Sequence, residues 1–449
     1  MKEQNQRAVF VTRLGAVAAT VGSAVGLGNI WRFPYEAGTH GGGAFMVCYI
    51  AFIFILGVPV ICAEFMLGRG TRRNVFGAYR AAGGGNWKLA GYIGIIASLM
   101  ILSFYSVVAG WTVEYFTQSI TGALDFADQD SYHKHFDEFS TGTWRPVAYT
   151  LIFLLLNYLV LSRGVTKGIE RVSNVLMPLL FVLLIVFCVN SLSLPKAIEG
   201  LTFLFRPDFS ALDPSTLLGA LGQAFFSLSL GLGCMLTYGS YFNERTNIGR
   251  TALVTASLDT MVAILAGVII FPAVFTFGVS PAAGPTLVFE VLPSIFHNLP
   301  GGVMWSSLFF FLLFVASLTS TISMSEISIA YFTEQRGMSR RNATVLNTAI
   351  AMVFGTLCAL SFGSLSGHTI FGMTIFNLFD YVSSNILLPL GGIVISLFVS
   401  WKVDRNFVKR EMTSNGLYRC SYLPVLIFCL RYVCPTAIAL IMLNSLGII

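Results

Sequence analysis

Two glycine-rich clusters lie in the middle of long apolar runs, where they could expose main-chain oxygens. The first reads GSAVGLGN over residues 22–29 and the second reads SLSLGLG over residues 227–233. Because glycine costs about 1 kcal/mol in a helix interior relative to alanine, each cluster favours unwinding at mid-helix. An unwound helix offers free carbonyl oxygens, which are hard ligands that could line a binding site within the membrane. Close helix packing through glycine stays open as the alternative for either cluster alone.

Polar side chains inside other apolar runs add candidate oxygens. Asp259 lies within an apolar run, where a carboxylate is costly and indicates a functional site. Ala316, Thr319 and Ser320 lie one turn apart on one helix face, so a carbonyl and two hydroxyls can converge there. The alternative is that both hydroxyls bond back to the preceding turn of their own helix.

The composition indicates which elements carry these residues. The 449 residues are 55% hydrophobic and 11% charged, with a mean hydropathy of +0.76, whereas soluble domains are about 25% charged. About 20 apolar residues cross a bilayer, so we predict an all-α polytopic membrane protein with eleven transmembrane helices. The predicted spans are Thr12 to Tyr35, Ala44 to Leu67, Leu89 to Ile120, Val147 to Leu161, Val172 to Val189, Leu217 to Tyr238, Leu253 to Val279, Met304 to Phe332, Ala343 to Phe362, Ile370 to Trp401 and Tyr422 to Leu446.

The loop charges predict the orientation. Arginines and lysines gather in alternate loops, from Arg69 to Lys88 and again from Arg163 to Arg171, whereas the opposite loops are acidic or neutral in balance. By the positive-inside rule the basic side is cytoplasmic. We therefore expect a multi-pass protein of the cell inner membrane, with its amino terminus in the cytoplasm and its carboxyl terminus outside. The net charge of +6 is small and spread over these loops, which argues against a nucleic-acid partner.

The two glycine clusters lie in the first and sixth spans, at corresponding places in two sets of five. That arrangement predicts inverted five-helix repeats with broken helices 1 and 6 and a binding site at the membrane midplane. The first repeat is expected over residues 8–190, the second over 216–403, and an additional helix 11 over 404–449, all within a single domain of residues 1–449.

Several motifs make the chain resemble a known family. They are RLG at residues 13–15, GLGNIWRFP at 26–34, GGGAF at 41–45 and GQAFFSLS at 222–229. They are similar to the signature of the neurotransmitter:sodium symporters, which have the leucine-transporter fold. Eleven spans, and no cysteine pair in the second outer loop, resemble the prokaryotic branch. The resemblance implies a transporter and not an enzyme: a sodium-coupled symporter that imports an amino acid by alternating access.

The resemblance also implies two sodium ions. The first site would use Ala24, Asn29, Ser227 and Asp259, together with the substrate carboxylate. The second would use Gly22, Val25, Ala316, Thr319 and Ser320.

The resemblance further implies whether transport requires chloride. Chloride-dependent relatives place the anion among positions that match Tyr49, Gln223, Ser227 and Ala263, and Ala263 has no hydroxyl. Asp259 stands where the family's commonest residue is asparagine. We therefore expect Asp259 to supply the fixed negative charge, so that transport requires no chloride.

Substrate contacts follow from the same resemblance. Glycine at position 26 leaves empty the place where monoamine-transporting relatives have an aspartate, so the substrate is expected to bring its own carboxylate. A mostly apolar lining favours a hydrophobic or aromatic L-amino acid. The expected binding residues are Ala24, Gly26, Leu27, Gly28, Ile101, Tyr105, Phe226, Ser227, Ser229, Leu232, Ser320, Thr321 and Met324.

The resemblance also implies an outer gate and an inner gate. Arg32 and Asp380 resemble the outer ion pair, with Tyr105 and Phe226 as a lid over the substrate. The inner gate is expected from Arg7, Glu334, Tyr241 and Glu326. Phe10 replaces a tryptophan of the family, which puts that packing contact in question. Gly168 and Pro178 predict a stretch of the fifth span that unwinds to let water reach the second sodium site.

Two other classes of function stay open. Glycine-broken helices also line channels, although the sequence has no repeated filter loop, and an amino-acid sensor would retain the binding site without turnover. The expected partners are a small amino acid, sodium ions and the lipid bilayer. A homodimer is left open.

Overall fold

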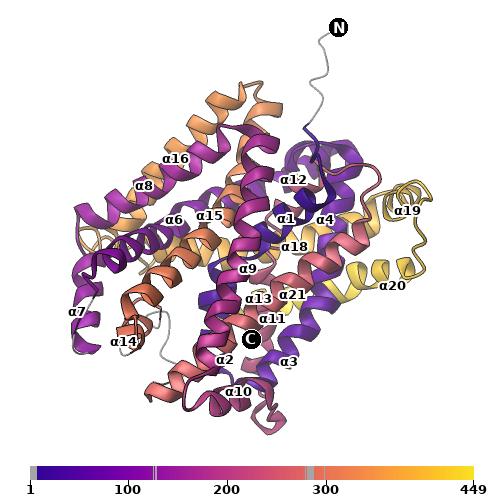
Figure 1. Cartoon of the computed structure of the whole chain (residues 1–449). Coiled ribbons are helices and arrows are strands. Elements are labelled where there is room, and N and C mark those ends of the chain that lie inside the picture. The colour runs from indigo at the N-terminus through magenta and orange to yellow at the C-terminus, as the bar shows by residue number, and fades with distance from the viewer. Residues whose placement is uncertain are drawn as a thin grey trace.

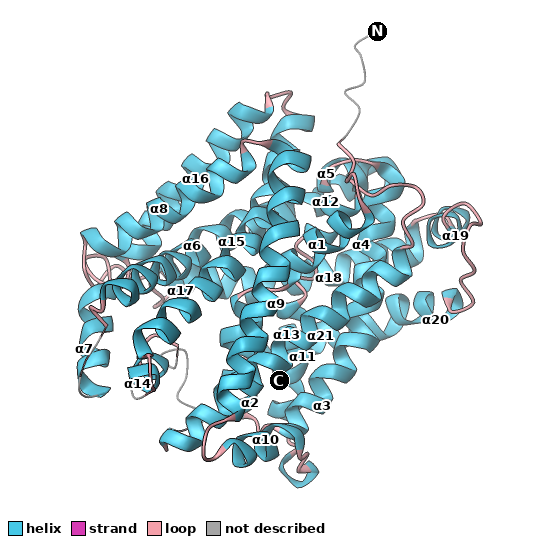
Figure 2. Cartoon of the chain, viewed as in Figure 1, coloured by secondary structure: helices cyan, strands magenta, loops and turns pink. Residues whose placement is uncertain are grey.

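The structure, a computed structural model, describes residues 8–124, 126, 129–278, 280, 288–297 and 299–448. The expected inner-gate residue Arg7 and the end of the seventh expected span at Val279 lie outside these residues. In the described part the chain is helical (Figure 2), and its extended structure is limited to an isolated bridge between Ile370 and Met373. The all-α prediction is confirmed.

The α-helices follow one another with short connections. The first half contains α1 (Arg13–Ala24), α2 (Phe33–Thr39), α3 (Gly43–Phe52), α4 (Val58–Thr71), α5 (Val75–Gly83), α6 (Ala90–Thr121), α7 (Gln129–Ser140), α8 (Trp144–Leu161), α9 (Arg171–Leu192) and α10 (Ala197–Phe205). The second half contains α11 (Pro214–Ser227), α12 (Cys234–Gly239), α13 (Ile248–Phe277), α14 (Val291–His297), α15 (Gly302–Gln335), α16 (Arg340–Leu360), α17 (Ile375–Tyr381), α18 (Leu388–Leu397), α19 (Arg405–Thr413), α20 (Leu423–Phe428) and α21 (Cys434–Ser445).

Short π-helical segments join several of these helices into longer rods. Within the described residues, nine helices, counting each joined rod as one helix, are long and apolar enough to cross a membrane. A tenth crossing is a bent pair, Arg13–Ala24 and Gly28–Thr39, with a 50° angle between its halves. The sixth expected span is also interrupted, since α11 ends at Ser227 and α12 begins at Cys234. Both predicted breaks are therefore present, and a total of eleven crossings stays a prediction.

Helices α6 and α15 form the centre of the bundle and hold the broken helices in place. They have 32 and 34 residues and are apolar on all sides, as expected for helices surrounded by others. The two pack against each other along their length, and α1 packs against α9, α13 and α15. Figure 1 shows α7, α10 and α14 at one end of the bundle and α12 and α19 toward the other.

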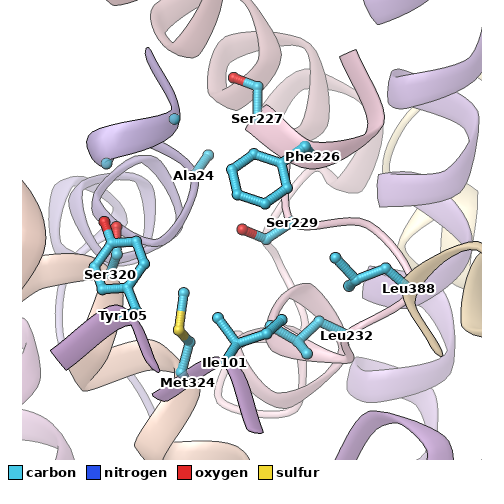
Figure 3. A pocket seen from close by; sticks show the side chains of 12 residues that line it. Ala24, Ile101, Tyr105, Phe226, Ser227, Ser229, Leu232, Ser320, Met324 and Leu388 are labelled. Carbon is cyan, nitrogen blue, oxygen red and sulfur yellow. The ribbon is translucent and has the colours of Figure 1, made fainter. Parts of the chain in front are cut away.

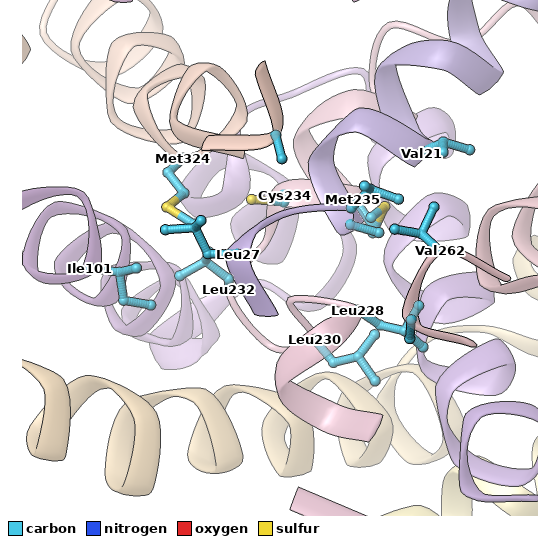
Figure 4. Packing of buried hydrophobic residues seen from close by; sticks show 14 of the residues in the cluster. Val21, Leu27, Ile101, Leu228, Leu230, Leu232, Cys234, Met235, Val262 and Met324 are labelled. Carbon is cyan, nitrogen blue, oxygen red and sulfur yellow. The ribbon is translucent and has the colours of Figure 1, made fainter. Parts of the chain in front are cut away.

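Apolar side chains from both interruptions take part in the core. Figure 4 shows Leu27, Leu228 and Leu230 among the buried hydrophobic residues, and each of the three is at most 2% exposed. Within a bilayer, where lipid is as apolar as leucine, such side chains stabilise the bundle through van der Waals packing. The unwound segments are therefore held by packing, although they lack regular helical hydrogen bonds.

Candidate functional site

The first interruption ends α1 cleanly and leaves carbonyl groups free. Val25 follows the last helical residue, Ala24, with an extended backbone at φ −67° and ψ 118°. The chain becomes helical again at Gly28. Carbonyls in the last turn of a helix have no amide four residues later to bond. The break therefore offers main-chain oxygens at the depth that the glycine cluster predicts.

The second interruption uses left-handed backbone. Ser229, Gly231 and Gly233 have φ values of 51°, 80° and 84°. A side chain at Gly231 would come within 2.4 Å of the Leu388 carbonyl oxygen, so glycine is required there. Ser229 adopts a conformation that is costly for residues with a side chain, as is common at functional sites.

Glu64 fixes the backbone of this second interruption, although it was not among the expected functional residues. Its carboxylate, on the buried helix α4, accepts hydrogen bonds from the amides of Gly231 at 2.9 Å and Leu236 at 3.1 Å. Charge-assisted bonds of this kind are about twice as strong as neutral ones. Glu64 lies inside the second expected span, so the argument that selected Asp259 could have found it.

Three of the four protein residues expected at the first sodium site meet in one network. Asn29 Nδ2 donates to Ser227 Oγ at 2.9 Å and to Asp259 Oδ1 at 2.7 Å. Ser227 Oγ donates to Asp259 Oδ2 at 2.7 Å, and the Tyr49 hydroxyl lies 3.2 Å from Ser227 Oγ. The side chains of this network, Asn29, Ser227, Asp259 and Tyr49, are each at most 2% exposed. The fourth expected residue, Ala24, lies on the wall of the adjoining cavity.

The residues expected at the second sodium site join α1 to α15. The Ser320 hydroxyl donates to the Val25 carbonyl at 3.0 Å, across the interface. Thr319 Oγ1 instead bonds back to Val315 and Ala316 carbonyls of its own helix. A side chain at Gly22 would contact Thr319 Cβ at 3.4 Å. The Ser320 hydroxyl thus bonds to the break in α1, whereas the Thr319 hydroxyl bonds within its own helix. Both alternatives for this pair therefore occur. The set contains neutral oxygens only, which suits a monovalent hard cation.

A cavity lies between the two interruptions and gathers most of the expected substrate contacts (Figure 3). Its polar groups include Tyr105 and Ser320, and the Leu27 amide donates to the Tyr105 hydroxyl at 3.0 Å. Two expected contacts, Leu27 and Thr321, are not among the lining residues, and the Thr321 hydroxyl bonds to the Ser317 and Leu318 carbonyls of its own helix. Leu388 lines it and was not expected. The lining residues are Ala24, Gly26, Gly28, Ile101, Tyr105, Phe226, Ser227, Ser229, Leu232, Ser320, Met324 and Leu388.

The expected outer ion pair between Arg32 and Asp380 is not formed in this conformation, so their role as an outer gate stays a prediction. Arg32 Nε instead lies 3.3 Å from Glu36 Oε1, and its guanidinium lies 4.4 Å from the centre of the Phe226 ring. Asp380 Oδ1 accepts from the Ser384 hydroxyl at 2.9 Å. Asp380 therefore interacts within one turn of its own helix, whereas Arg32 also contacts a ring of α11. Phe226, expected in the lid, also lines the cavity beside Arg32.

The inner side carries a dense polar network. Glu326, expected in the inner gate, is fully buried and accepts from the Tyr241 hydroxyl at 2.6 Å. Arg340 donates to both oxygens of Glu326, at 2.9 and 2.7 Å. Glu334 Oε2 accepts from the Asn74 amide and side chain, both at 2.8 Å. Arg340 was missed, because the sequence places it in a basic loop like other arginines.

The start of α1 is fixed to the same side. Phe10 is buried and contacts Tyr238 and Tyr241 edge-on, so phenylalanine does make a packing contact where the family has tryptophan. The Glu170 carboxylate accepts from the Val11 amide at 3.0 Å and the Thr12 amide at 3.1 Å. Glu170 joins the start of the fifth span to the start of the first, which nothing in its sequence context indicated.

Gly168 and Pro178 both lie in helical segments of this conformation. Gly168 belongs to a π-helical segment, Val165–Glu170, and Pro178 lies inside α9. A side chain at Gly168 would come within 2.3 Å of the Val160 carbonyl oxygen, so the glycine allows close contact with α8. Unwinding in another conformation stays a prediction.

Comparison with known proteins agrees with the geometry. A model of the "Sodium:neurotransmitter symporter family" matches residues 7–144 and 132–448. A Bacillus subtilis protein described as an uncharacterized sodium-dependent transporter, YhdH, is 40% identical over 98% of both chains. A sodium-dependent transporter of Haemophilus influenzae is 36% identical, also over 98% of both. The crystal structure of MhsT in complex with L-phenylalanine matches with a TM-score of 0.90 and 42% identity, over 98% of this chain and 100% of MhsT.

Proposed function

The chain belongs to the sodium:neurotransmitter symporter family, and from that membership we propose that it imports a hydrophobic or aromatic L-amino acid with two sodium ions and without chloride. Membership makes it a multi-pass membrane transporter that couples an amino-acid-like substrate to sodium. The substrate class, the number of ions and the independence from chloride are the proposal. The observation that carries it is the cavity between two broken helices, with a buried carboxylate beside it.

The cavity supports a substrate with its own carboxylate. A side chain at Gly26 would come within 2.5 Å of Ser320 Oγ and 2.9 Å of the Tyr105 hydroxyl, so the protein has no room for an acid of its own there. The substrate carboxylate would take the Tyr105 hydroxyl and the Leu27 amide, which bond each other in this structure. The substrate ammonium would take carbonyls at the breaks near Ala24 and Phe226, with the Ser229 hydroxyl.

The rest of the lining supports an apolar side chain. Ile101, Leu232, Met324 and Leu388 contribute hydrocarbon or thioether surface, and none of the twelve lining residues carries a formal charge. A charged substrate side chain would remain unpaired there, which is expensive in a buried site. The phenylalanine bound to the similar protein MhsT supports the same substrate class.

Asp259 supports independence from chloride. Its carboxylate lies beside the Tyr49 and Ser227 hydroxyls, with Gln223 and Ala263 on neighbouring parts of the same helices, all fully or almost fully buried. A carboxylate already placed among these groups would repel a second anion. The same charge would favour a sodium ion at the first site.

The proposal includes alternating access in the cell inner membrane, with the amino terminus cytoplasmic. The second sodium ion would be held by the Gly22, Val25 and Ala316 carbonyls with the Thr319 and Ser320 hydroxyls, and would stabilise the contact between α1 and α15. Arg32 and Asp380 would form their ion pair when the outer side closes.

A binding screen of the twenty amino acids, with sodium or with potassium, tests this proposal. We expect saturable binding of large apolar amino acids in sodium and at least tenfold weaker binding in potassium. Uptake into vesicles should be unchanged when gluconate replaces chloride. Equal binding in both cations would refute sodium coupling. Binding without uptake would favour a sensor, and sodium flux without saturation would favour a channel.

A further inference from the structure

The last membrane span carries a positive charge that the transport cycle does not use. Arg431 lies in the rod formed by α20, the π-helical segment Cys429–Val433 and α21. It is eight residues after the first residue of α20, which places its Cα about 12 Å along the helix. An arginine at such a depth is costly unless its guanidinium reaches the membrane interface or finds partners.

Its guanidinium points to the end of the neighbouring span. Arg431 Nη2 donates to the Ser400 carbonyl at 2.6 Å, and the guanidinium carbon lies 4.4 Å from the centre of the Trp401 ring. Both partners belong to the π-helical segment Phe398–Lys402, which ends the tenth expected span. Since helical side chains lean toward the amino-terminal end of their helix, the arginine reaches the predicted cytoplasmic boundary.

Among the described residues, no acidic group neutralises the charge of Arg431. No carboxylate among the described residues pairs with it, and its buried Nε atom has no hydrogen-bond partner there. A carbonyl oxygen and an aromatic face are its contacts, and neither carries a full negative charge. Lys402, exposed and next to Trp401, adds a second positive charge at the same boundary.

The surface beside Arg431 is apolar and aromatic. Trp401 is 62% exposed, Phe428 57% and Tyr432 50%. Their rings form a continuous row, since Tyr432 lies 6.3 Å from Trp401 and 5.5 Å from Phe428. Figure 1 shows α20 at the edge of the bundle, next to α19. In a membrane protein this row faces lipid, and tryptophan and tyrosine prefer the level of the headgroups.

We propose that Arg431, Trp401 and Lys402 form a binding site for the phosphate headgroup of an anionic phospholipid. The phosphate would take guanidinium donors that Ser400 leaves free, and the acyl chains would lie along Phe428 and Tyr432. Basic groups at such a boundary attract anionic lipids. A second copy of the chain fits poorly, because a two-fold contact through this patch would bring the arginines and lysines of both copies together.

The test uses the purified full chain in neutral detergent with added dioleoyl phosphatidylglycerol or dioleoyl phosphatidylcholine. Native mass spectrometry counts the lipids that remain bound. We expect phosphatidylglycerol to be retained in preference, and Arg431→Gln to weaken that retention about fivefold. Arg163→Gln removes one exposed cytoplasmic-side charge from the distant loop after α8 and should change nothing.

Two further measurements keep the result interpretable. Amino-acid binding by Arg431→Gln should equal that of the wild type, since the residue lies outside the transport site. If that variant does not fold, the wild-type melting temperature provides the test. It should rise with phosphatidylglycerol and not with millimolar inorganic phosphate.

Any of three results would overturn the site. Equal retention of both lipids, equal retention by Arg431→Gln and wild type, or an effect of inorganic phosphate as large as that of the lipid would do so. Loss of a dimer in Arg431→Gln would assign the patch to a second copy instead.

Discussion

The two sides of the central cavity are held in different ways. On the inner side, buried carboxylates join separate elements: Glu326 bonds Tyr241 and Arg340, and Glu170 bonds the start of α1. On the outer side, Arg32 bonds Glu36 and Asp380 bonds Ser384, four residues away along the same helix. Contacts within one helix do not hold two elements together. We therefore infer that, next to the cavity, buried carboxylates stabilise the inner side, whereas the expected outer gate residues join separate elements only through the contact of Arg32 with Phe226.

Removing the Arg340 charge should weaken the inner side more than any other change proposed below. In Arg340→Gln, the fully buried Glu326 loses its ion pair, and breaking a buried pair costs about 3 kcal/mol. Hydrogen exchange of residues 10–16 and 240–246 should accelerate by about a hundredfold, with loss of sodium-driven uptake. Arg341→Gln removes the exposed neighbouring charge and is the control. Unchanged exchange in Arg340→Gln would show that the pair does not hold the inner side closed.

A smaller effect is expected at the start of α1. Glu170→Gln keeps the shape but removes the charge that accepts from Val11 and Thr12, and bonds to charged groups contribute about 1.5–3 kcal/mol. The two amides should exchange at least tenfold faster than in the wild type. Lys167→Gln, an exposed change in the same segment, should leave them unaffected. If only global stability fell, Glu170 would be a general core residue and not a link between α1 and α9.

On the outer side, Asp380→Asn should change the resting structure little, because within the described part of the chain its carboxylate bonds only to Ser384 of its own helix. We expect less than about 0.5 kcal/mol in stability and unchanged exchange on both sides. Uptake should nevertheless fall, since the pair with Arg32 is expected on closure. Normal uptake by this variant would remove Asp380 from the outer gate.

The smallest effect concerns an ion pair between outer loops. The hydrogen bond that His133 on α7 donates to Glu290 raises the pKa of this exposed histidine, with further contributions from the charge of Glu290 and from Asp137 and Asp130. A raised pKa means that the contact stabilises the fold below the ordinary histidine pKa and loses this effect as pH rises through the shifted value.

The stability difference between wild type and His133→Gln should therefore be present at pH 5.5 and absent at pH 9, as measured by thermal unfolding. A difference that is the same at both pH values would contradict the assignment.

Much of the site could be found from local sequence. Both interruptions were predicted, because a glycine cluster inside an apolar run weakens a helix wherever that helix packs. Asp259 was found from the cost of a charge in an apolar span, and Glu64 satisfies the same criterion but was overlooked. The resemblance to the family then supplied most of the cavity lining, although it did not indicate Leu388, and the expected contacts Leu27 and Thr321 lie outside the lining in this conformation.

Other features depend on pairs that the sequence does not relate. Arg340 and Glu170 stand among ordinary loop charges, and only their partners make them important. The expected pair of Arg32 and Asp380 is absent from this conformation and stays a prediction, since a transporter has to make and break its gate contacts with one and the same sequence.

The sequence by itself determined the helical membrane architecture, the places where two helices break and the family, because hydropathy and backbone preference act within a few neighbouring residues. Only the tertiary structure decided which charges meet and which side of the cavity is held closed. The reason is physical: an ion pair depends on the distance between helices that are tens to hundreds of residues apart, and that distance changes between conformations.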